Sequence, residues 1–167
     1  MLDAANREPH VANRAAPAAS NRDSRLTIHG TILAFDFGER YLGVAVGDTV
    51  TRIAHPLETI DAEARAARFA AIAKLVTEWQ PVRLVVGLPL SLDGEEHELT
   101  RRARRFARQL EGRFSLPVAL ADERLSSADA AARLREAGRG GRRDKDLVHP
   151  VAAQIILQAH LDESPSA

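Results

Sequence analysis

Runs of apolar residues separated by short polar turns divide most of the chain into strands and helices. Two strand-length runs, residues 31–37 and 41–48, are joined by three residues, which is the spacing of a β-hairpin. Residues 54–60 predict a third strand beside them. The continuous apolar run at residues 82–90 is typical of a strand buried on both faces. Residues 116–123 predict a fifth strand.

Helical patterns fill the intervals between the later strands and follow the last one. Residues 62–80 place apolar side chains at helical spacing and stop just before Pro81. Residues 95–113 predict an arginine-rich helix, and residues 126–138 predict a helix with the form of a capping box at its start. Residues 150–161 predict an apolar final helix, whose proline is tolerated because it lies in the first turn.

The order strand, strand, strand, helix, strand, helix, strand, helix, helix indicates an α/β fold, a mixed five-stranded sheet flanked by helices. A chain of 167 residues suits one domain, here residues 29–162. The first 28 residues lack the apolar centre of a secretory signal and are expected to be a disordered tail. Residues 163–167 form a short C-terminal tail.

Composition excludes several classes of protein. The formal net charge is zero, so a nucleic-acid partner must be met by a local basic patch. No cysteine is present, which excludes disulfides and thiolate zinc sites and fits a cytoplasmic protein. No run of 18 apolar residues occurs, so no membrane partner is expected.

Acidic residues at strand ends are the first candidates for chemistry. Asp36 lies between two phenylalanines in an apolar run, where an unpaired carboxylate would be costly. Glu123 ends the fifth predicted strand, and Asp146 and His149 precede the last helix. If the fold brings carboxylates together, they suit a hard divalent cation. Two such ions roughly 4 Å apart would support phosphodiester hydrolysis, so the hypothesis is a nuclease.

Five motifs in order carry a resemblance to a known family: "LAFDFGERYLGVAVGD", "PLETI", "VVGLPLSLDG", "DERLSS" and "VAAQIIL". Over about residues 31–161 the chain resembles the YqgF family of pre-16S ribosomal RNA nucleases, related to the RuvC-type Holliday junction resolvases. The resemblance implies an RNase H-like fold and metal-dependent endonucleolytic hydrolysis in maturation of the 5′ end of 16S rRNA. It also implies that Asp36 and Glu123 are catalytic and bind the metal.

The family's third acidic position falls on His149, which is a departure from the family pattern. A neutral imidazole offers one nitrogen lone pair and suits Mn²⁺ better than Mg²⁺, whereas the carboxylates suit Mg²⁺. Either ion is therefore expected as the cofactor. Asp146 lies three residues earlier and could supply the missing charge if a helix begins there. His149 could equally be a helix cap or a surface histidine.

A basic loop next to these residues is the candidate nucleic-acid interface. Residues 138–146 combine glycines with cations and predict a mobile segment that closes over a phosphate backbone. The candidate contacts are Arg139, Arg142, Arg143 and Lys145, together with Arg124 beside Glu123. In the arginine-rich helix, glutamates accompany the arginines, so a solvated face of mixed charge is expected there.

Two other functions remain open, a nucleic-acid-binding factor without catalysis and a resolvase acting on branched DNA. A phosphotransferase of the actin or sugar-kinase type also opens with an Asp-x-Gly hairpin. That class needs a second domain of similar size to close over ATP, and the chain has no residues for it. The expected oligomeric state is a monomer or a weak dimer.

Overall fold

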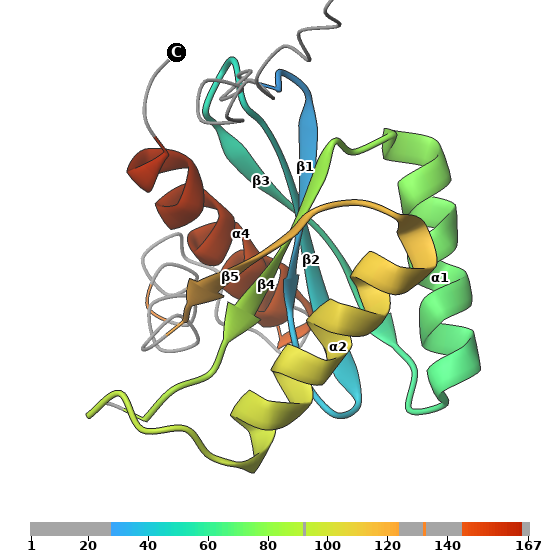
Figure 1. Cartoon of the computed structure of the whole chain (residues 1–167), viewed down its shortest axis with the longest axis vertical. Coiled ribbons are helices and arrows are strands. Elements are labelled where there is room, and N and C mark those ends of the chain that lie inside the picture. The colour runs from blue at the N-terminus through green and yellow to red at the C-terminus, as the bar shows by residue number, and fades with distance from the viewer. Residues whose placement is uncertain (1–27, 92, 124–131, 133–144, 165–167) are drawn as a thin grey trace, which may run out of the picture.

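A computed structural model describes residues 28–91, 93–123, 132 and 145–164 (Figure 1). Its strands are β1 (Thr31–Asp36), β2 (Tyr41–Asp48), β3 (Ala54–Asp61), β4 (Arg83–Leu88) and β5 (Val118–Asp122). Its helices are α1 (Arg65–Trp79), α2 (Glu98–Phe114) and α4 (Lys145–Glu163). All five predicted strands are confirmed, and the predicted helices at residues 62–80 and 95–113 agree with α1 and α2 to within three residues.

The strands form one mixed sheet in the order β3-β2-β1-β4-β5. β2 pairs with β1 and β3 in antiparallel fashion, which confirms the predicted hairpin and the third strand beside it. β4 pairs in parallel with β1 on one side and β5 on the other. The carboxyl ends of β1, β4 and β5 therefore lie at the same end of the sheet.

Helices cover both faces of the sheet, with α1 and α2 on one face and α4 on the other (Figure 1). Alternate residues of β1 supply the two cores. Leu33 and Phe35 pack toward α1 and α2, whereas Ile32 and Ala34 pack toward α4. The next residue of β1, Asp36, therefore belongs to the α4 face.

The start of the final helix differs from the prediction. α4 begins at Lys145, so Pro150 lies inside the helix and not in its first turn. A proline at this position has no N–H for the carbonyl of residue 146. The Thr59 hydroxyl of β3 donates to the Asp146 carbonyl at 2.9 Å, and this bond replaces the one that the proline removes. The prediction was wrong because sequence pattern alone does not reveal a distant donor.

Four other predicted segments fall mainly outside the described residues. These are the helix at residues 126–138, most of the loop at residues 138–146, and nearly all of the two tails. The last two loop residues belong to α4. None of the described helices combines the length and the hydropathy that crossing a lipid bilayer requires.

Candidate active site

Two carboxyl groups from separate strands meet on the α4 face of the sheet. Asp36 is the last residue of β1 and is only 9% exposed. Glu123 follows β5 directly, and its backbone N–H donates to the Leu88 carbonyl at 3.3 Å. The two side chains lie within hydrogen-bonding distance of each other. The expected convergence of Asp36 and Glu123 is therefore present in the structure.

Gly87 of β4 leaves the space that this pairing needs. β4 lies between β1 and β5, so the Glu123 side chain must cross it to reach Asp36. A Cβ atom at residue 87 would lie 2.3 Å from Glu123 Oε2 and 2.6 Å from the Ile156 Cδ1 atom. Because such contacts are far inside van der Waals distance, only glycine allows the observed arrangement.

Burial and mutual repulsion leave the carboxyl pair with a proton. Burial, and after it the nearby Asp36 and Asp122 charges, together raise the pKa of Glu123 to about 9. Burial also raises the pKa of Asp36, although the Glu123 hydrogen bond and the nearby His149 side chain act in the opposite direction. At neutral pH and without a cation, Glu123 is therefore the protonated partner.

One oxygen of the pair lacks a partner. Glu123 Oε2 is buried and accepts no hydrogen bond from any described residue. A buried polar atom without a partner is uncommon and calls for an explanation such as an ion. Two dehydrated carboxyl groups with a free oxygen are the ligand chemistry that a hard divalent cation prefers. The residues present therefore fit a metal held by Asp36 and Glu123.

His149 lies close to this pair, in the second turn of α4. Its imidazole stacks on the Tyr41 ring at 5.2 Å between centroids, and it lies close enough to Asp36 to influence the pKa of that carboxyl group. The backbone of α4 contacts β2 at Gly43, the pairing partner of Asp36, where a Cβ atom would lie 2.1 Å from the His149 carbonyl oxygen. This close approach places the histidine beside the carboxyl pair.

The other predicted site residues are less directly involved or are not described. Asp146 is exposed one turn before His149, and among the described residues no three Asp, Glu or His side chains are grouped so as to hold a metal. The basic residues Arg124, Arg139, Arg142 and Arg143 lie outside the described part of the chain, and Lys145 opens α4.

Sequence reasoning missed three residues that shape the site. Gly87 and Gly43 provide close approaches, and Tyr41 provides the ring on which His149 stacks. The glycines left a signal, because a glycine inside a strand marks a bulge or a close approach of another group. Tyr41 left none, since an aromatic residue is ordinary in a strand.

Comparison with known proteins identifies the family. The family described as "RuvX: Holliday junction resolvase" matches residues 30–163. A protein of Methylobacillus flagellatus named "Putative pre-16S rRNA nuclease" is 58% identical over 146 residues, covering 87% of this chain and 95% of that protein. A protein of the same name from Dechloromonas aromatica is 60% identical over 136 residues, covering 81% and 92%.

A solved structure agrees on the fold alone. The Fowlpox virus resolvase, crystallised with Holliday junction DNA, superposes with a TM-score of 0.50 at 9% identity, covering 79% of this chain and 97% of that one. This likeness and the strand order confirm the RNase H-like fold class. With its matched family, its close relatives and its paired carboxyl groups, the chain belongs to the RuvX family of nucleases, described as Holliday junction resolvases.

Proposed function

We propose that this protein is a cytoplasmic, divalent-metal-dependent endonuclease that hydrolyses phosphodiester bonds in the 5′-end maturation of pre-16S rRNA. The observation that carries the proposal is the Asp36 and Glu123 pair, dehydrated and joined across Gly87 with one oxygen unpartnered. The RNA substrate is supported by the names of the two relatives, which share more than half of their aligned residues with this chain.

Each site residue has a distinct task in this reaction. Asp36 and Glu123 would hold Mg²⁺ or Mn²⁺, and the bound cation supplies Lewis acidity at the phosphate. Glu123 must first release its proton, which its raised pKa otherwise retains. His149, beside Asp36, would hold or move a proton at an imidazole nitrogen. The apolar core beneath these groups keeps bulk water from the carboxyl pair.

Asp36→Asn is the direct test of the proposed function. The change keeps the shape of the side chain and removes its charge, so cleavage of an end-labelled pre-16S RNA should fall by about a hundredfold or more. Glu111→Gln removes an exposed carboxylate of α2 and should leave the rate unchanged. Thermal melting checks that both variants are folded. Equal cleavage by Asp36→Asn and the parent chain would show that the carboxyl pair is not the catalytic centre.

A four-way DNA junction in a parallel reaction tests the second candidate. The family's own description names Holliday junctions, and this favours a resolvase activity as the alternative. Faster cleavage of the junction than of the RNA would assign the chain to DNA. Binding of the RNA in excess chelator, without cleavage of either substrate when Mg²⁺ or Mn²⁺ is present, would assign it a non-catalytic role.

A further inference from the structure

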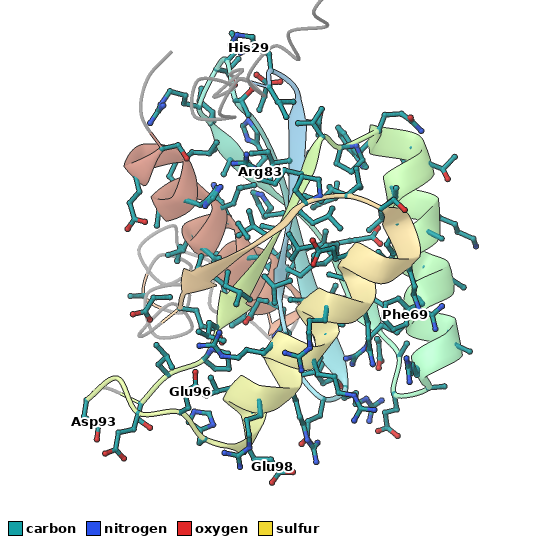
Figure 2. The ribbon with its side chains drawn as sticks, in the orientation of Figure 1. His29, Phe69, Arg83, Asp93, Glu96 and Glu98 are labelled. Carbon is teal, nitrogen blue, oxygen red and sulfur yellow. The ribbon has the colours of Figure 1, made fainter. Side chains whose placement is uncertain are left out.

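A pocket of about 390 Å³ opens between α1 and α2, on the face of the sheet opposite the carboxyl pair. Four arginines line it, two from each helix: Arg65, Arg68, Arg102 and Arg105. Its apolar floor includes Phe37, which directly follows β1, and Phe69, which Figure 2 shows on the side of α1 that faces α2. Such a grouping of like charges attracts anions.

Protein carboxylates neutralise only part of this charge. Arg102 pairs with Glu39 at 2.5 Å and with Glu98 at 2.7 Å. Glu63, the one acid that lines the pocket, faces Arg40 at 4.0 Å. The other three arginines of the pocket form no ion pair with any described residue: Arg65, Arg68 and Arg105. The pocket therefore carries an excess of positive charge.

Arg68 is the fixed member of this group. It is 6% exposed, and its Nε and Nη2 atoms donate to the carbonyls of Ala62 at 3.2 Å and Glu39 at 2.6 Å. The guanidinium also lies over the Phe37 ring, 5.5 Å from its centroid. Burial lowers the pKa of Arg68, and no described carboxylate offsets this effect. An anion in the pocket would meet a guanidinium that is already in place.

The chemistry of the pocket fits a phosphate and not a base. Arg113 and Arg65 lie over the Phe69 ring at 4.1 Å and 5.9 Å, so this ring offers no open surface for stacking. Phe106 is 3% exposed, and the Arg68 guanidinium lies over the third ring of the pocket, Phe37. Guanidinium groups recognise phosphate oxygens through paired N–H donors. A ligand bound in this way is held by its backbone, whatever its sequence.

The end of β1 links the pocket to the carboxyl pair. Asp36 and Phe37 are neighbours in the chain, and they belong to opposite faces of the sheet. A strand of nucleic acid that crosses this edge can meet both sites. We infer that the arginine pocket binds the phosphate backbone of the substrate strand away from the bond that is cut. This inference rests on the proposed function.

The test compares two double variants, both in the Asp36→Asn background and in excess chelator, so that binding is measured without cleavage. Arg65→Gln with Arg105→Gln removes two exposed cations from the pocket. Lys74→Gln with Arg108→Gln removes one exposed cation from each of the same helices outside it. The probe is a labelled single-stranded RNA from the 5′ end of the precursor, titrated at several salt concentrations.

We expect the pocket variant to bind about tenfold more weakly, with a log–log salt slope smaller by about 1.4 for two lost phosphate contacts. The control variant should match its parent. Restoring charge with Arg65→Lys and Arg105→Lys should recover the slope. Equal losses in both double variants, or no loss in the pocket variant, would overturn the inference, as would failure of the parent to bind the RNA.

Adenosine monophosphate provides a second arm that distinguishes the source of the phosphate. If it binds the parent tightly, fails to bind the pocket variant and displaces no RNA, the pocket is a mononucleotide site and the inference is wrong. Cleavage by the otherwise unaltered chain is assayed separately. A chain that binds through the pocket but cuts nothing would refute the proposed function and leave the arginine pocket in place.

Discussion

Glu123 shows most clearly how position changes the chemistry of one residue. An exposed glutamate would be ionised at neutral pH, whereas burial beside Asp36 raises its pKa to about 9. The folded chain therefore binds a proton that the unfolded chain releases. Because the folded pKa is the higher one, stability is fully present below the ordinary pKa of 4.5 and is lost as pH rises through about 9.

Glu123→Gln should remove this pH dependence in the metal-free protein. The amide keeps the side chain's shape and a donor for Asp36 but carries no titrating proton. We expect the free energy of unfolding of the parent chain to fall between pH 5 and pH 9, at no more than about 1.4 kcal/mol per pH unit from this group. Denaturant unfolding in chelator measures it. Glu111→Gln is the matched control, and parallel curves for parent and Glu123→Gln would contradict the prediction.

His149→Asp tests the departure from the family pattern. An aspartate at this position supplies a hard oxygen ligand, so the preference between metals should shift from Mn²⁺ toward Mg²⁺. Cleavage rates with each ion measure this shift. An unchanged metal preference would make His149 a bystander.

A site residue could be predicted from the sequence when its role depends on the local pattern around it. Asp36 was recognisable because a charge inside an apolar run is costly. Its partner Glu123 was recognisable mainly through the resemblance to a family. Gly87, on which their meeting depends, sits inside an apolar run where its role becomes visible only when β5 lies beside β4.

At the scale of elements, β4 separates β1 from β5, and the absence of a side chain at Gly87 lets the two carboxyl groups meet across it. Gly87→Ala should separate the carboxyl groups, because the new methyl would meet Glu123 Oε2 and Ile156. We expect cleavage to fall by about tenfold or more, with a loss of stability of about 1–3 kcal/mol. Activity assays and thermal unfolding measure the two effects.

Gly112→Ala is the matched control for that change. It lies in α2 with nothing within 4 Å of an added Cβ atom, so alanine should stabilise the helix by about 0.5–1 kcal/mol and leave cleavage unchanged. Full activity in Gly87→Ala would show that the close approach is not needed. Lost activity in Gly112→Ala would show that α2 as a whole is sensitive to substitution.

Element boundaries were predictable where local chemistry decides them. α1 ends at Trp79, just before Pro81, because a proline disfavours helical backbone in the residue before it. The same reasoning failed at α4. There a hydroxyl from β3 satisfies the carbonyl that Pro150 leaves free, and this tertiary contact is not encoded in the local pattern.

For the whole molecule, metal binding and stability should be linked. A cation that binds Asp36 and Glu123 in the folded chain alone displaces the shared proton, so it should raise the melting temperature more at pH 8 than at pH 5. Thermal melts with and without Mg²⁺ or Mn²⁺ measure this shift. It should vanish in Asp36→Asn and remain in Glu111→Gln. An equal shift in all three proteins would place the cation elsewhere.

The sheet as a whole was predictable because strand-length runs, turns and their order agree with one another. The arginine pocket was not. The sequence of α2 indicates a face of mixed charge, and Arg102 and Arg104 do pair with glutamates. Arg105 forms no ion pair with a described residue and lines the pocket together with arginines of α1, a grouping that no pattern within one helix discloses.

The hydroxyl bond from Thr59 to Asp146 also divides the site into parts that can open separately. Asp36 and Glu123 are held by strands in the interior and at one side of the sheet, whereas the start of α4 is tied to β3 at the other side. Helix α4 lacks one backbone hydrogen bond next to His149, because Pro150 has no N–H to donate. In amide exchange, an opening confined to the edge strand β3 should therefore expose the amides at the start of α4 before those of the central strand β1, which carries Asp36.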